Sequence, residues 1–419
     1  MNTQINLYIA DMTTSDNTSG VDRYINCLIN GLQKYQYINI HWIHFIHDPQ
    51  QIFLKEELIN TYIKYNIPLP QQYNSIISKR YWMRKYNEQV YRLVKYMFED
   101  KDNCIFHLHT LNLIDLAVLL QERLGCKIIT HLHCIPWKNL YNTDKKRFNK
   151  LYNLFYHQSN GLKQLSSDQF VTNNCELQSY AAPDALICVT HCAVDFLNTC
   201  INNHCDNMYV IPNGINDFSH ASEIRLSKTI YDDFHCLYVG VINESKGINY
   251  ILKAVEKVQS MGYRIKLTIA GKYNPSFPLF LQNCYPHLNL DLKGRISFDE
   301  LKDLYSVCDI GLIASLQEQA SYVAIEMAMF GLPIITTAVD GLDEIFTDEV
   351  NALKVNTRFS PIFGLSVDVD MMTKQIIRLI HNHSLRERLS INARQLYLDE
   401  LNLELMVNRT VEVYKQLIK

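Results

Sequence analysis

One stretch of the sequence, residues 309–335, constrains the fold more than any other. It consists of an apolar run, a polar segment that begins at Glu318, a segment that contains Glu326, a break at Gly331 and a second apolar run. This order predicts a buried strand, a loop, a helix and a second buried strand, as in a parallel α/β sheet. Such sheets bind ligands at the carboxyl ends of their strands. Because the free N–H groups at a helix start favour a phosphate, we expect a phosphorylated ligand near Glu318.

Two further strand-to-helix turns contain a glycine. An alternating strand over residues 5–9 leads into a polar loop, and Gly20 begins a helical pattern. In the second half, a strand that ends at Gly240 is followed by Lys246-Gly247 and an amphipathic helix over residues 248–258. Glycine allows a ligand phosphate to approach the backbone closely. The alternative for Gly20 is an ordinary turn glycine.

The chain length of 419 residues predicts two domains. We expect them at residues 1–215 and 216–395, joined by a polar linker, with a last segment at residues 396–419. The formal net charge of -3 argues against nucleic acid as a main partner. The N-terminus does not resemble a signal peptide, and no apolar run is long enough to span a membrane.

The 12 cysteines are scattered, and several lie inside apolar runs. This distribution favours reduced, buried thiols in a cytoplasmic protein over a disulfide framework. Cysteines and histidines crowd together between residues 188 and 205, but their spacing matches no regular zinc pattern. We therefore expect no metal site.

Histidines end two predicted strands in the first half of the chain. His107 and His109 alternate along one strand, and His131 and His133 alternate along the next, so that each pair shares one face. These side chains either line a ligand site where the strands end or are core histidines bonded to the backbone.

Three segments together carry a family resemblance. They are the pair Glu318 and Glu326 with seven residues between them, the stretch Val210-Ile211-Pro212-Asn213-Gly214, and the dipeptide Lys246-Gly247. The chain resembles the retaining glycosyltransferases of the GT-B architecture, in particular family 4 (glycosyl transferases group 1). The resemblance implies an α/β fold with two Rossmann-like, doubly wound parallel-sheet domains that face each other across a cleft. The first would bind the acceptor and the second the nucleotide sugar, and the last helix would cross back to the first domain.

The resemblance also implies an activity. It is the transfer of a hexose, with retention of configuration, from a UDP- or GDP-type nucleotide sugar, without a cofactor or metal. The site residues that it implies are, for catalysis, Glu318, His133 and Lys246, and, for donor binding, Gly20, Gly240, Lys246, Gln319, Ala320, Ser321 and Glu326. Glu326 would bind the ribose, Lys246 the diphosphate, and Glu318 with the backbone of residues 319–321 the sugar. His133, ahead of His131 and His109, would face the sugar.

The sequence departs from the family pattern at several positions. Val241 stands where the family has an arginine that neutralises the diphosphate, and Lys272 is a candidate substitute. Gln319 and Ser321 replace glycines, so the loop is bulkier. These departures keep two alternatives open. One is a catalytically silent subunit that binds a nucleotide sugar, and the other is an epimerase or phosphorylase on the same architecture.

A basic segment with an apolar stripe occupies residues 79–95. Such a helix could rest on an anionic membrane at its cytoplasmic (inner) face, or bind a lipid-linked acceptor. The alternative is a surface helix with a buried stripe and a solvated face. The acceptor, which could be a polysaccharide, a lipid-linked sugar as in bacterial glycan biosynthesis, a peptide or a small molecule, stays open.

Overall fold

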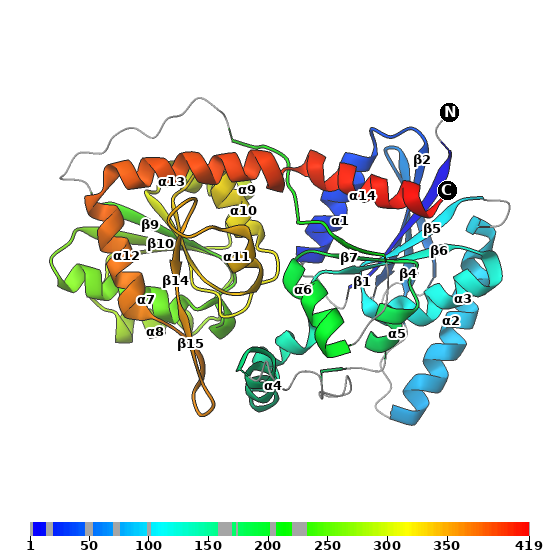
Figure 1. Ribbon diagram of the computed structural model, residues 1–419, viewed down its shortest axis with the longest axis horizontal. Helices are drawn as coiled ribbons and strands as arrows, with labels where there is room; N and C mark the ends of the chain where they lie inside the picture. The colour runs from blue at the N-terminus through cyan, green and yellow to red at the C-terminus, as the bar shows by residue number, and fades with distance from the viewer. Residues whose placement is uncertain are drawn as a thin grey trace. The chain divides into compact units, whose positions relative to one another are not determined.

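The computed structural model describes residues 3–13, 20–46, 53–69, 76–98, 102–157, 170–172, 175–201, 207–219 and 233–418. Its contacts divide the chain into two compact units (Figure 1). The first comprises Met1–Pro136, Gly161–Pro212 and Leu403–Lys419, and the second Trp137–Asn160 and Asn213–Asn402. Each unit contains a largely parallel sheet, so the predicted α/β class is confirmed.

The first unit is built on an eight-stranded sheet in the order β3-β4-β2-β1-β5-β6-β7-β8. The strands are β1 (Ile5–Thr13), β2 (Ile38–Ile46), β3 (Lys55–Ile59), β4 (Tyr62–Pro68), β5 (Cys104–Leu108), β6 (Lys127–Leu132), β7 (Ala185–Cys188) and β8 (Met208–Val210). Neighbouring strands run parallel, except that β3 and β4 form an antiparallel hairpin at the edge. The central strand β1 buries the apolar run of residues 7–10, as is usual for a parallel sheet with both faces covered.

The helices of the first unit are α1 (Gly20–Leu32), α2 (Ile76–Phe98), α3 (Ile114–Leu124), α5 (Glu176–Ala181), α6 (His191–Phe196) and α14 (Leu403–Leu417). Helix α14 packs on α1 (Figure 1), and Val407 lies directly against Gly31. Tyr414 of α14 reaches the sheet, where its hydroxyl lies 2.8 Å from Nδ1 of His107. The C-terminal helix is thus part of the core of the first unit.

Helix α2 contains the predicted basic segment. Val90 and Val94 of its apolar stripe are buried in the core of the first unit, whereas Arg84 and Lys85 are exposed. The side chains of Lys79 and Arg80 lie outside the described residues. A buried stripe with a solvated basic face fits a membrane-surface helix and an ordinary surface helix equally well. Membrane contact through residues 79–95 therefore stays a prediction.

The second unit is built on a parallel six-stranded sheet in the order β11-β10-β9-β12-β13-β14. Its strands are β9 (Phe234–Val239), β10 (Ile265–Ala270), β11 (Leu290–Gly294), β12 (Ile310–Ile313), β13 (Ile334–Thr337) and β14 (Leu353–Val355). Strands β15 (Thr357–Ser360) and β16 (Gly364–Val367) form a separate antiparallel hairpin. The helices are α4 (Lys145–His157), α7 (Ile248–Ser260), α8 (Phe277–Cys284), α9 (Phe298–Val307), α10 (Tyr322–Met329), α11 (Asp340–Ile345), α12 (Val369–His381) and α13 (His383–Leu396).

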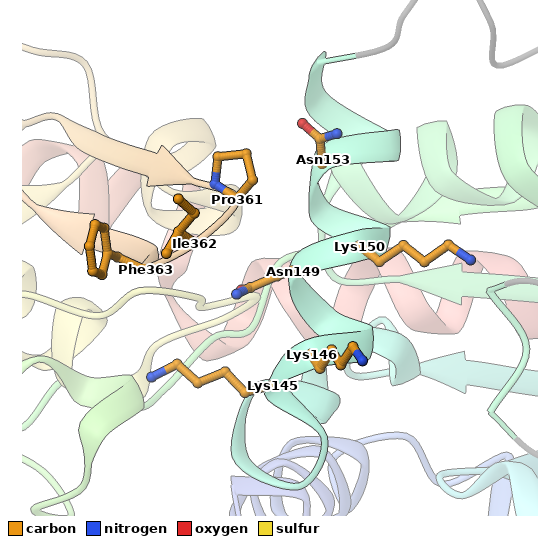
Figure 2. A pocket seen from close by; sticks show the side chains of 8 residues that line it. All are labelled: Lys145, Lys146, Asn149, Lys150, Asn153, Pro361, Ile362 and Phe363. Carbon is orange, nitrogen blue, oxygen red and sulfur yellow. The ribbon is translucent and has the colours of Figure 1, made fainter.

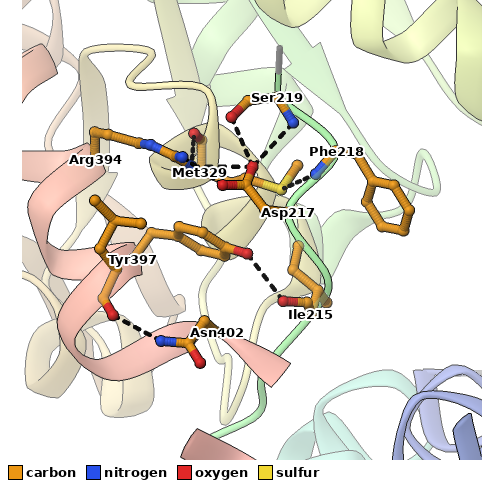
Figure 3. A network of polar contacts seen from close by, with 9 residues as sticks. Ile215, Asp217, Phe218, Ser219, Met329, Arg394, Tyr397 and Asn402 are labelled. Carbon is orange, nitrogen blue, oxygen red and sulfur yellow. Dashed lines mark hydrogen bonds and ion pairs between the residues drawn. The ribbon is translucent and has the colours of Figure 1, made fainter. Parts of the chain in front are cut away.

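The segment that enters the second unit is held by a polar network (Figure 3). Arg394 of α13 pairs with Asp217 and donates to the carbonyl of Met329 at 2.7 Å. The hydroxyl of Tyr397 donates to the carbonyl of Ile215 at 3.0 Å. Residues 215–217 are therefore docked on the second unit rather than acting as a free linker.

Residues 137–160 differ from the sequence expectation. They fall within the predicted first domain of residues 1–215, but their contacts are with the second unit. The physical reason is long-range packing, because Tyr152 of α4 stacks on Phe359 of β15 with ring centroids 4.8 Å apart. The predicted boundaries of the acceptor-binding and donor-binding domains, at residues 215 and 395, stay predictions.

Two further observations concern the described residues only. Each cysteine among them is a free thiol. None of their helices is long and apolar enough to cross a membrane.

The packing of α14 on α1 leads to a stability prediction. A Cβ atom on Gly31 would lie 2.4 Å from Cγ2 of Val407, which is well inside van der Waals contact. We expect Gly31→Ala to destabilise the protein by roughly 1–3 kcal/mol in denaturant unfolding, although the same change in an open helix stabilises by about 1 kcal/mol. Val407→Ala should recover part of the loss in the double variant. A Gly31→Ala variant that is more stable than the wild type would contradict this packing.

Candidate functional site

The candidate site lies where the order of the second sheet reverses. From β9 the chain continues to β10 and β11 on one side, and from β12 to β13 and β14 on the other. Strands β9 and β12 are neighbours, so the loops that follow them meet at the carboxyl edge of the sheet. Open α/β sheets bind ligands at such a reversal. The two loops are residues 240–247 and 314–321.

Close backbone packing locks these two loops together. The amide of Leu316 donates to the carbonyl of Ser245 at 2.8 Å. Gly247 has φ of +69° and approaches Ala314 so closely that a Cβ atom would lie 1.9 Å from the Ala314 carbonyl oxygen. Both the left-handed backbone and the contact exclude other residues from position 247. The predicted turn glycine is therefore required by the fold itself.

Lys246 and Glu318 are brought together by this packing. Nζ of Lys246 forms an ion pair with Oε2 of Glu318, and the hydroxyl of Ser315 lies 3.4 Å from the same oxygen. The Lys246 side chain is 35% exposed and the Glu318 side chain 13%. The backbone carbonyl of Glu318 accepts from the amide of Gly341 at 2.9 Å. One cation and one carboxylate thus lie side by side at the sheet edge.

The loop after Glu318 leads into α10. Ser321 caps this helix, and its hydroxyl accepts from the amide of Ala324 at 3.3 Å. Gln319 and Ser321 are buried, whereas Ala320 is partly exposed. Side chains larger than the family's glycines are therefore accommodated inside the second unit.

Glu326 lies on α10 and is buried. The hydroxyl of Tyr305 in α9 donates to its Oε2 at 2.6 Å. Glu326 therefore does not face bulk solvent, and Tyr305 orients its carboxylate. Its predicted role in binding a ribose stays a prediction. Sequence patterns did not identify Tyr305 as a partner, because its spacing from Glu326 carries no motif.

The turn after β9 contains Gly240 and Val241. Gly240 has φ of +144°, and a Cβ on the adjacent Gly271 would lie 1.9 Å from the Gly240 carbonyl oxygen. Val241 is 52% exposed beside this turn. The amide of Ile242 donates to the carbonyl of Lys272 at 2.9 Å, so Lys272 lies next to the position that lacks the arginine.

A buried charged group that sequence reasoning missed lies next to the same loops. Lys138 pairs with Asp340, and their side chains are only 5% and 6% exposed. The hydroxyl of Tyr156 donates to Asp340 at 2.6 Å. Asp340 has φ of 43° and precedes Gly341, whose amide bonds Glu318. Asp340 begins α11, and its partners come from a distant segment of the chain, so no local sequence pattern identifies the pair.

Gly20 and His133 belong to the first unit. Gly20 is exposed and begins α1. His133 is half-buried, and its Nε2 lies 2.9 Å from Nδ1 of His109. The predicted alternation is confirmed, because the four histidine rings gather on one face at the ends of β5 and β6, next to the ring of Tyr24. The rings of His109, His131 and His133 are stacked, and that of His107 is tilted against them.

Among the residues that the structure describes, three of these histidines form a group that could hold a metal ion. One ring nitrogen each from His107, His109 and His131 lie within 4.8 Å of one another. Nδ1 of His131 also lies 3.3 Å from Nε2 of His107, a distance that fits a hydrogen bond between the rings. The expectation that the chain binds no metal stays a prediction, and this cluster is the place to test it.

The histidine cluster makes stability depend on pH. Burial lowers the pKa of both His107 and His133 to about 3, and it lowers the pKa values of His109 and His131 well below the usual range. The surrounding groups are Tyr24 of α1 and Tyr414 of α14, whose pKa values burial raises, so neither is charged near neutral pH. The folded cluster is therefore neutral at pH values where free histidine is protonated.

We expect the free energy of unfolding to fall as pH is lowered from 7 to 5. Unfolded histidine takes up a proton below about pH 6.5, whereas the buried rings do not, so each contributes up to about 1.4 kcal/mol per pH unit in this window. Denaturant unfolding at several pH values measures the slope. His131→Gln should reduce the slope, and His287→Gln, which changes an exposed ring, should not. An unchanged slope in His131→Gln would contradict the assignment.

Comparisons with known proteins agree with this architecture. Residues 222–396 match the model of the family described as Glycosyl transferases group 1. An uncharacterized glycosyltransferase of Methanocaldococcus jannaschii is 29% identical over 223 residues, which cover 50% of this chain and 54% of the relative. The chain spans about half the length of the curated relatives it matches.

Among solved structures, sucrose-phosphate synthase from Thermosynechococcus elongatus superimposes with a TM-score of 0.73 at 17% identity, covering 99% of both chains. HepE of Anabaena, solved in complex with UDP-glucose, has a TM-score of 0.66 at 12% identity and covers 99% of this chain and 100% of that one. The fold is therefore that of the GT-B glycosyltransferases, and residues 222–396 are similar to the glycosyl transferases group 1 family.

Proposed function

We propose that the chain is a glycosyltransferase that moves a sugar from a nucleotide-diphosphate sugar, of the UDP or GDP type, to an acceptor. The observation that carries this proposal is the pairing of Lys246 with Glu318 at the reversal point of the second sheet, within the segment that matches the family. The structure of HepE with UDP-glucose supports a nucleotide sugar as the donor.

Each site residue has a proposed role. Lys246 neutralises the diphosphate, and Gly240 lies in the turn that approaches it. Gly20 lies in a turn that approaches either the phosphates of the donor or the acceptor. Glu318 and the backbone N–H groups of residues 319–321 hold the sugar. Glu326, oriented by Tyr305, binds the ribose. His133 faces the transferred sugar.

The proposed reaction retains the anomeric configuration, as in family 4. The bond between the anomeric carbon and the diphosphate oxygen breaks, a bond to the acceptor oxygen forms on the same face, and the acceptor proton passes to the leaving phosphate. Little covalent work falls to the protein, so positioning and electrostatic stabilisation of the phosphate supply most of the rate. No metal or cofactor is part of the proposal.

The ion pair has a consequence for donor binding. In the structure Glu318 forms an ion pair with Lys246. A bound diphosphate would compete with Glu318 for Lys246 and release the carboxylate to accept hydrogen bonds from sugar hydroxyls. The pair therefore keeps both groups in position before the donor arrives.

The proposal also covers where in the cell the protein acts. The protein would act in the cytoplasm, with surface contact through α2 at the inner face of a membrane. The acceptor class, whether polysaccharide, lipid-linked sugar, peptide or small molecule, is left open.

Slow hydrolysis of the donor tests the roles of Lys246 and Glu318. We expect Lys246→Met and Glu318→Gln each to lower the hydrolysis rate of the preferred nucleotide sugar by about 10²-fold or more, as in other sites that stabilise developing charge. Lys253→Met and Glu387→Gln change exposed charges of the same unit and serve as matched controls. Hydrolysis that is unchanged in both site variants would contradict the proposed roles.

One observation favours a second candidate, a catalytically silent subunit that binds a nucleotide sugar. Val241 leaves an exposed apolar side chain where the family has a cation. Lys272, whose backbone lies alongside, is the proposed substitute. An epimerase is a further alternative, and it would release an altered nucleotide sugar that product analysis detects.

Substitutions at these two positions separate an active enzyme from a silent subunit. If Lys272 replaces the missing cation, Lys272→Met should lower donor turnover by about tenfold or more, and Val241→Arg should restore part of the loss. Turnover of the double variant is compared with the wild type. Donor binding without turnover in the wild type, together with turnover gained in Val241→Arg, would instead support the silent subunit.

A further inference from the structure

The tip of the β15–β16 hairpin exposes two large apolar side chains. Ile362 is 82% exposed and Phe363 is 84% exposed. The tip is a three-residue loop, and the hydroxyl of Ser360 accepts from the amides of both residues at 3.3 Å. The loop conformation is thus held by hydrogen bonds while its side chains face water. Single exposed apolar side chains are common on protein surfaces, whereas exposed apolar side chains that lie together mark interaction sites.

The hairpin is fixed to α4, so the tip and this helix form one surface. Phe359 stacks on Tyr152, and a Cβ on Gly364 would lie 3.0 Å from Oδ1 of Asn149. The two elements line a hollow of about 630 Å³. Figure 2 shows the tip on one side of this hollow and the side chains of α4 on the other. We call the tip and this helix the hairpin–α4 surface.

The hairpin–α4 surface is strongly basic. Helix α4 contains Lys145, Lys146, Arg147 and Lys150 and no acidic residue, in a chain whose formal net charge is -3. Lys145 pairs with Glu244. Lys146 and Lys150 are exposed and form no ion pair with any residue that the structure describes. Positive charge is thus concentrated beside an uncovered apolar tip.

We propose that the hairpin–α4 surface docks the protein on an anionic lipid bilayer, with Ile362 and Phe363 entering the boundary between headgroups and acyl chains. An apolar protrusion flanked by lysines fits this boundary, because each lysine is attracted to anionic headgroups while the apolar side chains leave water. A protein partner fits less well, because lysine is depleted in protein–protein interfaces. This surface shares no residue with the proposed donor loops or with α2, and it adjoins the donor loop of residues 240–247 through the pair of Lys145 with Glu244.

Vesicle sedimentation of the full chain tests the proposal. The probes are vesicles of phosphatidylcholine alone and of phosphatidylcholine mixed with phosphatidylglycerol. We expect binding to the mixed vesicles at low salt and weaker binding at high salt. The double variant Ile362→Ser/Phe363→Ser should lower the partition coefficient by about tenfold or more. Lys146→Gln/Lys150→Gln should lower it by a similar factor.

Matched variants elsewhere in the second unit serve as controls. Ile391→Ser removes another exposed apolar side chain, and Lys253→Gln/Lys374→Gln removes two exposed lysines; both should bind as the wild type does. A Phe363→Trp variant adds a direct readout, because lipids with brominated acyl chains should quench its fluorescence beyond the quenching of the wild type.

Several outcomes would overturn the proposal. These are no binding of the wild type to mixed vesicles at low salt, wild-type binding by the Ile362→Ser/Phe363→Ser variant, or loss of binding only in Arg84→Gln/Lys85→Gln of α2. The donor hydrolysis rate in the absence of vesicles should be the same in the tip variant and the wild type. This readout separates a failure of docking from a failure of the proposed enzyme function.

Discussion

The contact between Gly247 and the carbonyl of Ala314 is the constraint on which the candidate site depends. Two loops that follow neighbouring strands can approach this closely only if one of them has no side chain at the point of contact. The hydrogen bond from Leu316 to Ser245 fixes their register. Lys246 and Glu318 then meet without any need for a rearrangement. Backbone packing, rather than attraction between the two charges, therefore places the pair.

The surrounding residues support this arrangement from several directions. The hydroxyl of Thr337 donates to the carbonyl of Ser315 at 2.5 Å, and the amide of Gly341 donates to the carbonyl of Glu318. The buried pair of Lys138 and Asp340 holds the chain just before Gly341. A buried ion pair is weak evidence for stability. The pair lies next to the backbone of Glu318, so we infer that it orients the loop that contains Glu318.

The sequence predicted those parts of the structure that depend on local pattern. Apolar runs and the glycine breaks located the strands around residues 309–335, and period-two alternation placed the histidines of β5 and β6 on one face. The turn at Gly247 also followed from the pattern of a strand, a glycine-containing loop and a helix. These features depend on residues that lie close together in the sequence or on a repeated strand–turn–helix unit.

The features that the sequence did not predict depend on distant contacts. Nothing in residues 137–160 indicates that they pack with the second unit, because Tyr152 and Phe359 are separated by about half the chain. The pairing of Lys138 with Asp340 could not be predicted either, because these two residues are also far apart in the sequence. The antiparallel β3–β4 hairpin lies in a region interpreted only as an aromatic and basic insertion. The exposed tip of the β15–β16 hairpin has no motif, because exposure is a property of the folded chain.

The proposed donor site and the hairpin–α4 surface are built from loops of the second unit that differ in structure and suit different kinds of ligand. Loops at the sheet edge are short, rigid and rich in backbone contacts, which suits recognition of a compact charged ligand. The β15–β16 hairpin lies outside the six-stranded sheet and projects from it (Figure 1), which suits contact with an extended surface. The two share no residue, but they are connected, because Lys145 of α4 pairs with Glu244 in the loop of residues 240–247 and Tyr156 of α4 donates to Asp340.

The central claim is that the second unit binds a nucleotide sugar between the loops that contain Lys246 and Glu318. The most direct measurement is the unfolding temperature of the chain in the presence of UDP- and GDP-sugars, supplied one at a time. We expect one nucleotide sugar to raise it in a concentration-dependent manner, because a ligand that binds only the folded state stabilises that state, and we expect the shift to be lost in Lys246→Met. No shift with any of them, or an undiminished shift in Lys246→Met, would contradict the account.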